Sequence, residues 1–247
     1  HYREFANSLQ RHSMPREAYG IYRQLAALPD GALYGLAGQV KTAVAAGDYR
    51  AAKSALVDLQ TRFPTHTLTA EALQAYDNRY AGSATFGFRT YNDYKGNHIT
   101  AWDHSGDQAF GADNWAVLWG SASNRVSDDA DHVRVHDSRV GVAARERWWS
   151  SRVWVSDYRG AGQNTTGGHW DADLFLRDFT KLNFALAKQP VWDAQAWKNE
   201  PIMALTRTVS LSHRVGYGDF YDFSYTLDGY SDGNRFYGWS ANYSHNV

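Results

Sequence analysis

The chain has 247 residues, enough to bury a substantial core, and its 25 Lys and Arg against 26 Asp and Glu leave a formal charge of −1. This balance lacks the basic excess that nucleic-acid binding requires, and the absence of cysteine excludes disulfides, thiolate metal sites and thiol catalysis. No apolar run approaches the roughly 18 residues that a membrane-spanning helix needs.

The composition changes near residue 80, which predicts two domains. Residues 1–80 carry Ala and Leu at helical spacing, whereas residues 81–247 alternate with a period of two and are punctuated by Gly, Asn and Asp. The start at His1 shows charged residues and no apolar targeting segment, so we expect a mature or truncated product. The first domain is predicted to be α-helical and the second to be antiparallel β.

The helical domain contains two stretches that repeat with the tetratricopeptide period of about 34 residues. The equivalent positions are Ala18 with Ala52, Tyr22 with Leu56, and Leu25 with Leu59. A small Ala permits close approach of paired helices, and Pro29 or Pro64 ends each stretch. The alternative is an ordinary helical hairpin with chance spacing. Because such repeats bury their faces only by stacking, we expect further repeats upstream.

The β-domain is predicted to contain about nine or ten strands of about ten residues, the length of a transmembrane β-strand. The alternating segments are residues 84–91, 115–120, 137–145, 152–158, 169–177, 182–186, 203–214, 221–228 and 237–243. Short turns that alternate with longer polar segments, such as residues 123–131 and 159–168, are typical of periplasmic turns and extracellular loops. With 10 Trp, 16 Tyr and 11 Phe at a mean hydropathy of −0.57, this asymmetry favours a transmembrane β-barrel over a soluble β-sandwich.

Charged residues gather on the polar faces of these strands, where a barrel would place its lumen. The candidate pore-lining residues are Asp137, Asp171, Asp173, Asp222, Asp228, Arg89, Arg139, Arg145 and Arg177. In a wet lumen the carboxylates would attract a cationic, hydrated ligand. The equal alternative is a ladder of mutually neutralised charges that only maintains the shape of the barrel.

Three segments resemble the PgaA-like family of poly-β-1,6-N-acetylglucosamine export porins: residues 134–147, 201–209 and 227–240, the last around the turn Ser-Asp-Gly-Asn-Arg. The helical domain is similar to the periplasmic tetratricopeptide region of that family. The resemblance implies an outer-membrane porin of a Gram-negative bacterium that exports a partly deacetylated, hence partly cationic, polymer for biofilm formation. The family's barrel has sixteen strands, so residues 81–247 are either part of a larger barrel or form a smaller one.

The partners expected from this resemblance are the exopolysaccharide chain, outer-membrane lipid and a periplasmic polysaccharide deacetylase. The deacetylase would bind the helical domain, because stacked helical pairs form concave binding surfaces. Neither nucleic acid nor a cofactor is expected.

Patterns for catalysis and metal binding are weak. His132 and His136 share a strand face but have no predicted third ligand. Asp171 and Asp173 have a spacing of interest for a glycosidase, yet nothing in the sequence indicates a proton donor of raised pKa. We therefore expect no enzyme, no catalytic residue and no metal site. The remaining alternatives are a surface receptor, for example for phage, and a soluble β-sandwich carbohydrate-active protein.

Overall fold

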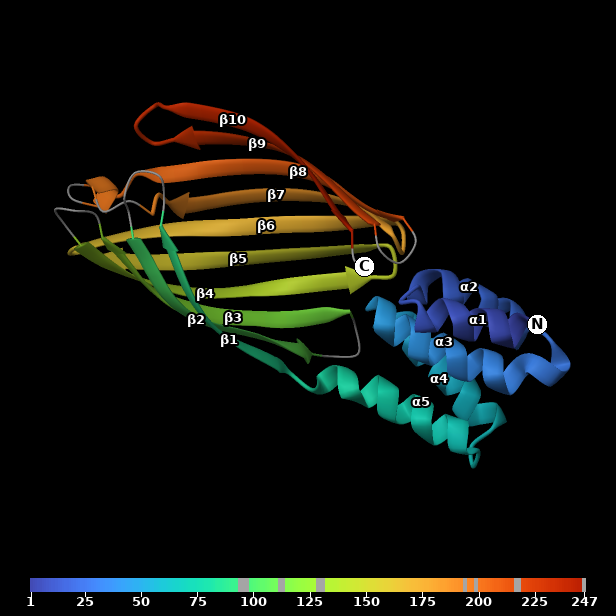
Figure 1. The fold of residues 1–247 in the computed structure, drawn as a ribbon. Helices are drawn as coiled ribbons and strands as arrows, with labels where there is room; N and C mark the ends of the chain where they lie inside the picture. The colour runs from blue at the N-terminus through green and yellow to red at the C-terminus, as the bar shows by residue number, and fades with distance from the viewer. Residues whose placement is uncertain are drawn as a thin grey trace.

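The structure, a computed structural model, describes residues 1–92, 98–110, 114–127, 132–192, 195–197, 200–215 and 219–245. A helical region comes first and is followed by one large antiparallel sheet (Figure 1). The helices gather at one end of the strands and do not cover either face of the sheet. We call this the helix end of the sheet and the opposite end the far end.

The helical region contains α1 (Tyr2–Arg11), α2 (Pro15–Ala26), α3 (Ala32–Ala46), α4 (Tyr49–Arg62) and α5 (Thr67–Asp77), with the 3₁₀ turns η1 (Pro29–Gly31) and η2 (Asn78–Tyr80). Local signals fix the ends of these helices. Pro15 is the first residue of α2, a position whose N–H has no intrahelical acceptor. Gly47 ends α3 with a left-handed φ of 78°, which glycine adopts without strain. Asp48 then caps α4 by accepting a hydrogen bond from the Ala51 N–H at 3.1 Å.

The repeated positions of the helical region lie in its core. Each is at most 8% exposed: Ala18, Ala52, Tyr22, Leu56, Leu25 and Leu59. The Tyr22 hydroxyl donates a hydrogen bond to Asn7 Oδ1 at 2.6 Å, and burial raises the pKa of its phenol. This burial is what a stacked repeat requires, while the assignment to the tetratricopeptide class stays a prediction.

None of the helices in the described part of the chain is both long and apolar enough to cross a membrane.

Ten strands pair strictly in chain order. They are β1 (Ser83–Asn92), β2 (His98–Phe110), β3 (Trp115–Ser127), β4 (His132–Glu146), β5 (Trp149–Gly160), β6 (Gln163–Arg177), β7 (Thr180–Pro190), β8 (Met203–Val215), β9 (Asp219–Tyr230) and β10 (Arg235–His245). Within the described residues β1 and β10 do not pair with each other, so the sheet is an open wall. An open sheet of this kind leaves two edge strands, β1 and β10, whose backbone groups are available for pairing.

One face of the sheet is apolar although it is exposed. Val140 and Val142 of β4 pair with Val155 and Val153 of β5, and all four side chains point to this face, which we call the outer face. Val140 is 62% exposed and Val155 is 60% exposed. Other large exposed side chains on the same face are Trp115, Trp119, Trp170, Leu174, Leu211, Phe223, Tyr225 and Trp239. Many large apolar side chains exposed on one face mark a surface that an apolar partner or a membrane covers.

The structure corrects three of the sequence-based boundaries. Residues 98–110 form a strand, β2, that the alternation did not predict. Residues 159–168 form no long loop, because β5 and β6 are joined by a tight turn in which Ala161 and Gly162 have φ of 50° and 75°. In the segment 123–131, β3 continues to Ser127 and residues 128–131 lie outside the described part. The predicted asymmetry between short turns and long loops is therefore weaker than the sequence suggested.

Candidate functional site: the inner face of the sheet

The opposite face of the sheet, which we call the inner face, is polar. Alternation and register bring the predicted acidic residues to it: Asp137 from β4, Asp171 and Asp173 from β6, and Asp222 and Asp228 from β9. Arg139 and Arg145 of β4 share this face, as does Arg89 of β1. The sheet thus places charged groups from strands far apart in sequence on one continuous surface.

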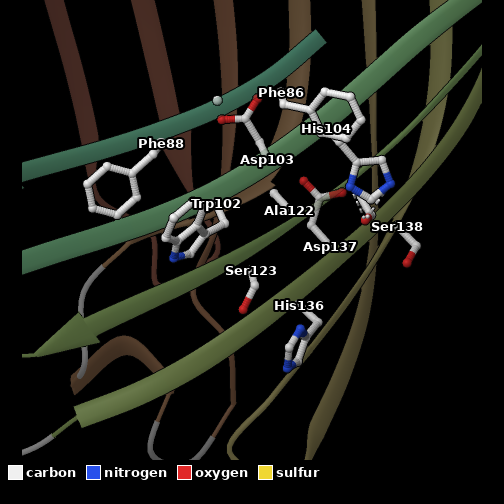
Figure 2. A pocket seen from close by; sticks show the side chains of 12 residues that line it. Phe86, Phe88, Trp102, Asp103, His104, Ala122, Ser123, His136, Asp137 and Ser138 are labelled. Carbon is white, nitrogen blue, oxygen red and sulfur yellow. Dashed lines mark hydrogen bonds between the residues drawn. The ribbon is translucent and has the colours of Figure 1, made fainter. Parts of the chain in front are cut away.

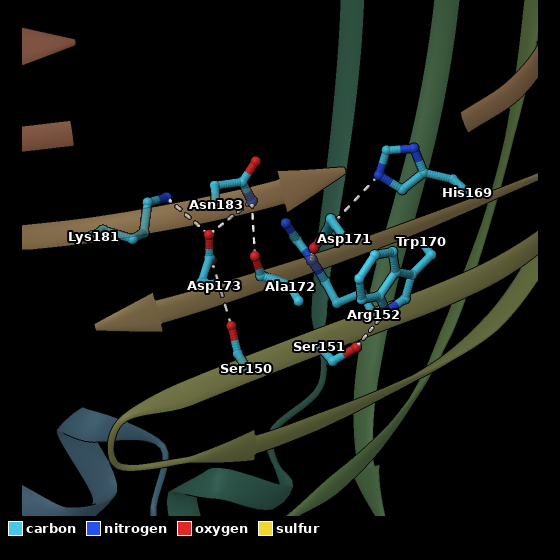
Figure 3. A network of polar contacts seen from close by, with 10 residues as sticks. All are labelled: Ser150, Ser151, Arg152, His169, Trp170, Asp171, Ala172, Asp173, Lys181 and Asn183. Atoms are coloured by element: carbon cyan, nitrogen blue, oxygen red, sulfur yellow. Dashed lines mark hydrogen bonds and ion pairs between the residues drawn. The ribbon is translucent and has the colours of Figure 1, made fainter. Parts of the chain in front are cut away.

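Asp171 is held in a dense polar network across β5 and β6 (Figure 3). Its Oδ2 accepts a hydrogen bond from Arg152 Nε at 2.8 Å, and its Oδ1 lies 3.3 Å from His169 Nε2. The Asp171 side chain is only 8% exposed, whereas that of Arg152 is 42% exposed. The carboxylate is therefore paired with a permanent cation at the surface of the wall.

Asp173 extends the same network to β7. Its carboxylate accepts hydrogen bonds from Asn183 Nδ2 at 2.9 Å and from Ser150 Oγ at 3.4 Å, and it lies 3.3 Å from Lys181 Nζ. Both acidic residues of β6 are consequently neutralised by neighbours on the adjacent strands. For this part of the inner face, the ladder of mutually neutralised charges describes the geometry.

The inner face of β8–β10 is different, because hydroxyl groups dominate it. The hydroxyl-bearing residues on this face are Thr206, Thr208, Ser210 and Ser212 of β8, Ser224 and Thr226 of β9, and Ser240 of β10. The Thr208 and Thr226 hydroxyls lie 3.2 Å apart, and those of Ser224 and Ser240 lie 2.8 Å apart. We call this surface the hydroxyl wall.

Asp222 and Asp228 stand at the two ends of the hydroxyl wall. Asp222 pairs with Ser212 and Asp228 with Thr206, so both carboxylates come from the face that carries the hydroxyls. Among the described residues neither carboxylate forms an ion pair, and Oδ1 of Asp228 is buried without a hydrogen-bond donor. This half of the inner face therefore carries two carboxylates together with one arginine of the same face, Arg214 of β8.

A further acidic pair lies on β2 and β4. Asp103 and Asp137 are in register on either side of Ala122 of β3. Both are among the residues that line a cavity of about 570 Å³, whose lining also includes outer-face residues such as Trp102 and His104 (Figure 2). Asp137 is 6% exposed, and its Oδ1 has no donor in the described part of the structure. Such an oxygen needs a water or ligand donor.

The far end of the inner face is covered by a short segment between β7 and β8. This segment contains the 3₁₀ turn η3 (Gln195–Trp197). Trp197 is fully buried against Val133 and Val135 of β4 and Tyr158 of β5, and its Nε1 donates to the Val191 carbonyl at 3.2 Å. A connection that leaves the sheet at β7 therefore packs over the inner faces of β4 and β5 at the far end.

Asp178, in the turn between β6 and β7, attaches the helical region to the sheet. Its carboxylate accepts hydrogen bonds from the backbone N–H groups of Arg16 and Glu17 at 3.2 and 2.9 Å and pairs with the Arg16 guanidinium at 3.1 Å. The Asp178 side chain is 1% exposed. An acidic group at this point is also favoured by the helix dipole of α2.

Two further contacts reinforce this attachment. Asn114 Oδ1, before β3, accepts from the Arg50 N–H of α4 at 2.9 Å, and the Arg147 guanidinium lies 4.4 Å from the ring centre of Tyr19. A cavity of about 290 Å³ opens between the helices and the inner face, lined by Arg145 and Arg152 among others. The inner face is therefore accessible next to the helical region.

Arg177 does not belong to the inner face, which differs from the sequence-based expectation. The register of β6 and β7 shifts between Phe175 and Arg177, so that Arg177 pairs with Thr180. Thr180 in turn pairs with His213, which alternates with the outward-facing Leu211. A β-bulge of this kind moves the following side chain to the other face.

Several residues that build the site were not singled out from the sequence: Arg152, His169, Lys181, Asp178 and Trp197. Arg152 and Lys181 lie on polar strand positions, so the alternation contained a signal for their face but none for their partners. Trp197 lies in a segment without periodicity. His132 and His136, considered as metal ligands, are exposed on the outer face, and no group of three or more potential ligands occurs among the described residues.

Comparison with known proteins supports the fold. No family model matches the chain, and no curated protein sequence matches it significantly. A solved structure described as a bacterial polysaccharide outer membrane secretin aligns over 67% of this chain and 55% of its own, with a TM-score of 0.53 and 15% identity. The chain thus spans about half the length of that structure.

A second solved structure, described as the KdgM porin in complex with disordered oligogalacturonate, aligns over 67% of this chain and 93% of its own, with 9% identity. Its TM-score is 0.40. Taken with the apolar outer face and polar inner face, the first alignment shows that residues of this chain share the fold of a β-barrel wall.

Proposed function

We propose that the chain forms part of the wall of an outer-membrane pore through which a polysaccharide is exported. The observation that carries this proposal is the inverted polarity of the sheet. Side chains such as Val140, Trp239 and Phe223 are exposed on the outer face, while carboxylates and hydroxyls occupy the inner face. Lipid on the outside and water on the inside are the environments that suit this distribution. The wall has no catalytic role in this proposal.

The inner face suits a hydrated, partly cationic polymer. The hydroxyl wall offers donors and acceptors at short intervals, so a sugar chain can exchange hydrogen bonds with it without strong binding at one place. Asp222 and Asp228 add two carboxylates that form no ion pair with another described residue, beside one arginine on the same face, Arg214. Free amines of a partly deacetylated β-1,6-N-acetylglucosamine polymer are the cations that the sequence resemblance implies, and we propose this polymer as the cargo.

The helical region lies on the periplasmic side in this proposal. Its attachment through Asp178 and Asn114 holds α2 and α4 beside the cavity that opens onto the inner face. A periplasmic polysaccharide deacetylase bound to these helices would deliver modified polymer directly to the pore entrance. The deacetylase is the partner that we propose for the helical region.

The test is secretion of the polymer by cells that lack the gene. The full-length gene should restore secretion, and a variant with Asp222→Asn and Asp228→Asn should reduce it while the protein reaches the membrane in normal amounts. An Asp232→Asn variant, altered in the exposed β9–β10 turn, is the matched control. Full secretion by the double variant would contradict the role of these carboxylates, and a protein that stays soluble without detergent would contradict the pore itself.

A further inference from the structure

Three arginines form a basic patch at the far end of the outer face. Arg125 of β3 pairs directly with Arg134 of β4, and Arg159 of β5 pairs with His136, the next outward-facing residue of β4. All three arginine side chains are exposed. We call Arg125, Arg134 and Arg159 the arginine patch.

The pairing of Arg125 with Arg134 is unfavourable by itself. Residues directly opposite on antiparallel strands have Cβ atoms about 5 Å apart, and like charges at this distance repel each other. In the described residues around the patch, the outer face offers one carboxylate, Asp157, which is bonded to Arg159 at 2.7 Å. An anion from outside the sheet would therefore relieve the repulsion between the two facing guanidinium groups.

The depth of the patch indicates where that anion resides. Trp115 lies on the outer face at the helix end of β3, and Arg125 follows it by ten residues. Ten residues span about 34 Å along a strand, or about 26 Å across the membrane at a tilt of about 40°. The apolar band of a membrane barrel is about 25 Å tall. The arginine patch therefore lies at the membrane boundary opposite the helical region.

We propose that the arginine patch binds the phosphate groups of an anionic lipid in the leaflet at the far end. A guanidinium presents a planar fork of donors that fits two phosphate oxygens at once, and two facing guanidiniums can share one phosphate. The bound phosphate would remove the repulsion between Arg125 and Arg134. This inference rests on the membrane embedding proposed above, and it does not depend on which polymer passes through the pore.

The test measures lipid binding by the full-length protein in detergent. The probes are lipid A with two phosphates, the same lipid without phosphates, and inorganic phosphate. For the double variant Arg125→Gln/Arg134→Gln we expect the affinity for the bisphosphorylated lipid to fall by about tenfold to a hundredfold, since charge-assisted hydrogen bonds are lost. The control Arg11→Gln/Arg23→Gln removes the same charge from the exposed surface of α1 and α2 and should bind as wild type.

Four results would overturn the proposal. Equal binding of the lipid by wild type and the patch variant would show that the arginine patch does not take part. Equal binding of the phosphate-free lipid would show that the phosphates do not take part. Full competition by millimolar inorganic phosphate would assign the patch to free anions. A patch variant that is less stable than wild type to the same extent with and without lipid would show that the patch stabilises the fold without a bound lipid phosphate. Polymer secretion, measured in parallel, separates these outcomes from failure of the export proposal.

Discussion

The two halves of the inner face use the same residue types in opposite ways. On β5–β7 the carboxylates of Asp171 and Asp173 are held by Arg152, His169 and Lys181. On β8–β10 Asp222 and Asp228 stand among hydroxyls and form no ion pair with another described residue. An acidic residue on a polar strand face therefore does not by itself give the inner face a free negative charge. The residues across the neighbouring strands decide whether its charge is available to a ligand.

The largest expected effect concerns the segment that packs over the inner faces of β4 and β5 at the far end. Trp197→Ala should destabilise this part of the molecule by about 3–5 kcal/mol, because a fully buried indole leaves a cavity. The single-channel conductance of the variant in planar bilayers should rise as the segment loosens. Trp239→Ala, 75% exposed on the outer face, is the matched control and should conduct as wild type. An unchanged conductance in Trp197→Ala would show that the segment does not narrow the passage.

The second prediction concerns the attachment of the helical region to the turn between β6 and β7. Asp178→Asn removes a charge that accepts three hydrogen bonds, and the loss should weaken attachment of the helical region by about 1.5–3 kcal/mol. Limited proteolysis of the folded protein should then release the helical region faster. Asp58→Asn, an exposed change on α4, should leave the rate unaltered. Equal rates for both variants would mean that the other contacts suffice.

The third prediction concerns the β5–β7 half of the inner face, where removal of one cation should leave a carboxylate unpaired. Arg152→Gln removes the cation beside Asp171, so the carboxylate should attract a passing cation by about 1 kcal/mol at contact distance in water. Because Arg152 faces solvent, the fold should tolerate the change. The reversal potential in asymmetric salt should shift toward greater cation selectivity. No shift would indicate that the charge of Asp171 is not available to ions that pass the inner face.

The smallest expected effect concerns a hydrogen bond between two hydroxyl groups of the hydroxyl wall. Thr208→Val removes one hydroxyl of the pair with Thr226, and the unfolding free energy should fall by about 0.5–1.5 kcal/mol. Thr166→Val, at an exposed position on the outer face of β6, is a control that lies outside this wall. A larger loss at Thr166 than at Thr208 would contradict the importance of the hydroxyl contact. Thermal or urea unfolding in detergent measures both.

Much of this architecture could be predicted from alternation, and the failures have physical causes. The strands β3–β10 show apolar residues on one side and polar ones on the other, which a period of two reveals. β2 escaped because polar residues such as Asp103 and His104 occupy both of its faces. Arg177 was assigned to the wrong face because a single bulge reverses the alternation beyond it.

The partners of the charged residues could not be predicted. Whether Asp171 meets Arg152 depends on the register between β5 and β6, which the tight turn at Ala161 and Gly162 sets. The contact between Arg16 and Asp178 joins residues far apart in the chain and has no periodic signal. For the same reason the sequence could not divide the acidic residues into paired and unpaired ones.

The reversal potential of the full-length pore in asymmetric salt tests the central claim most directly. Two double variants each remove two charges: Asp222→Asn/Asp228→Asn on the hydroxyl wall and Asp171→Asn/Asp173→Asn in the paired network. We predict a clear loss of cation selectivity for the first pair and a smaller change for the second, whose carboxylates are already neutralised. An equal loss in both variants, or a larger loss in the second, would contradict the account.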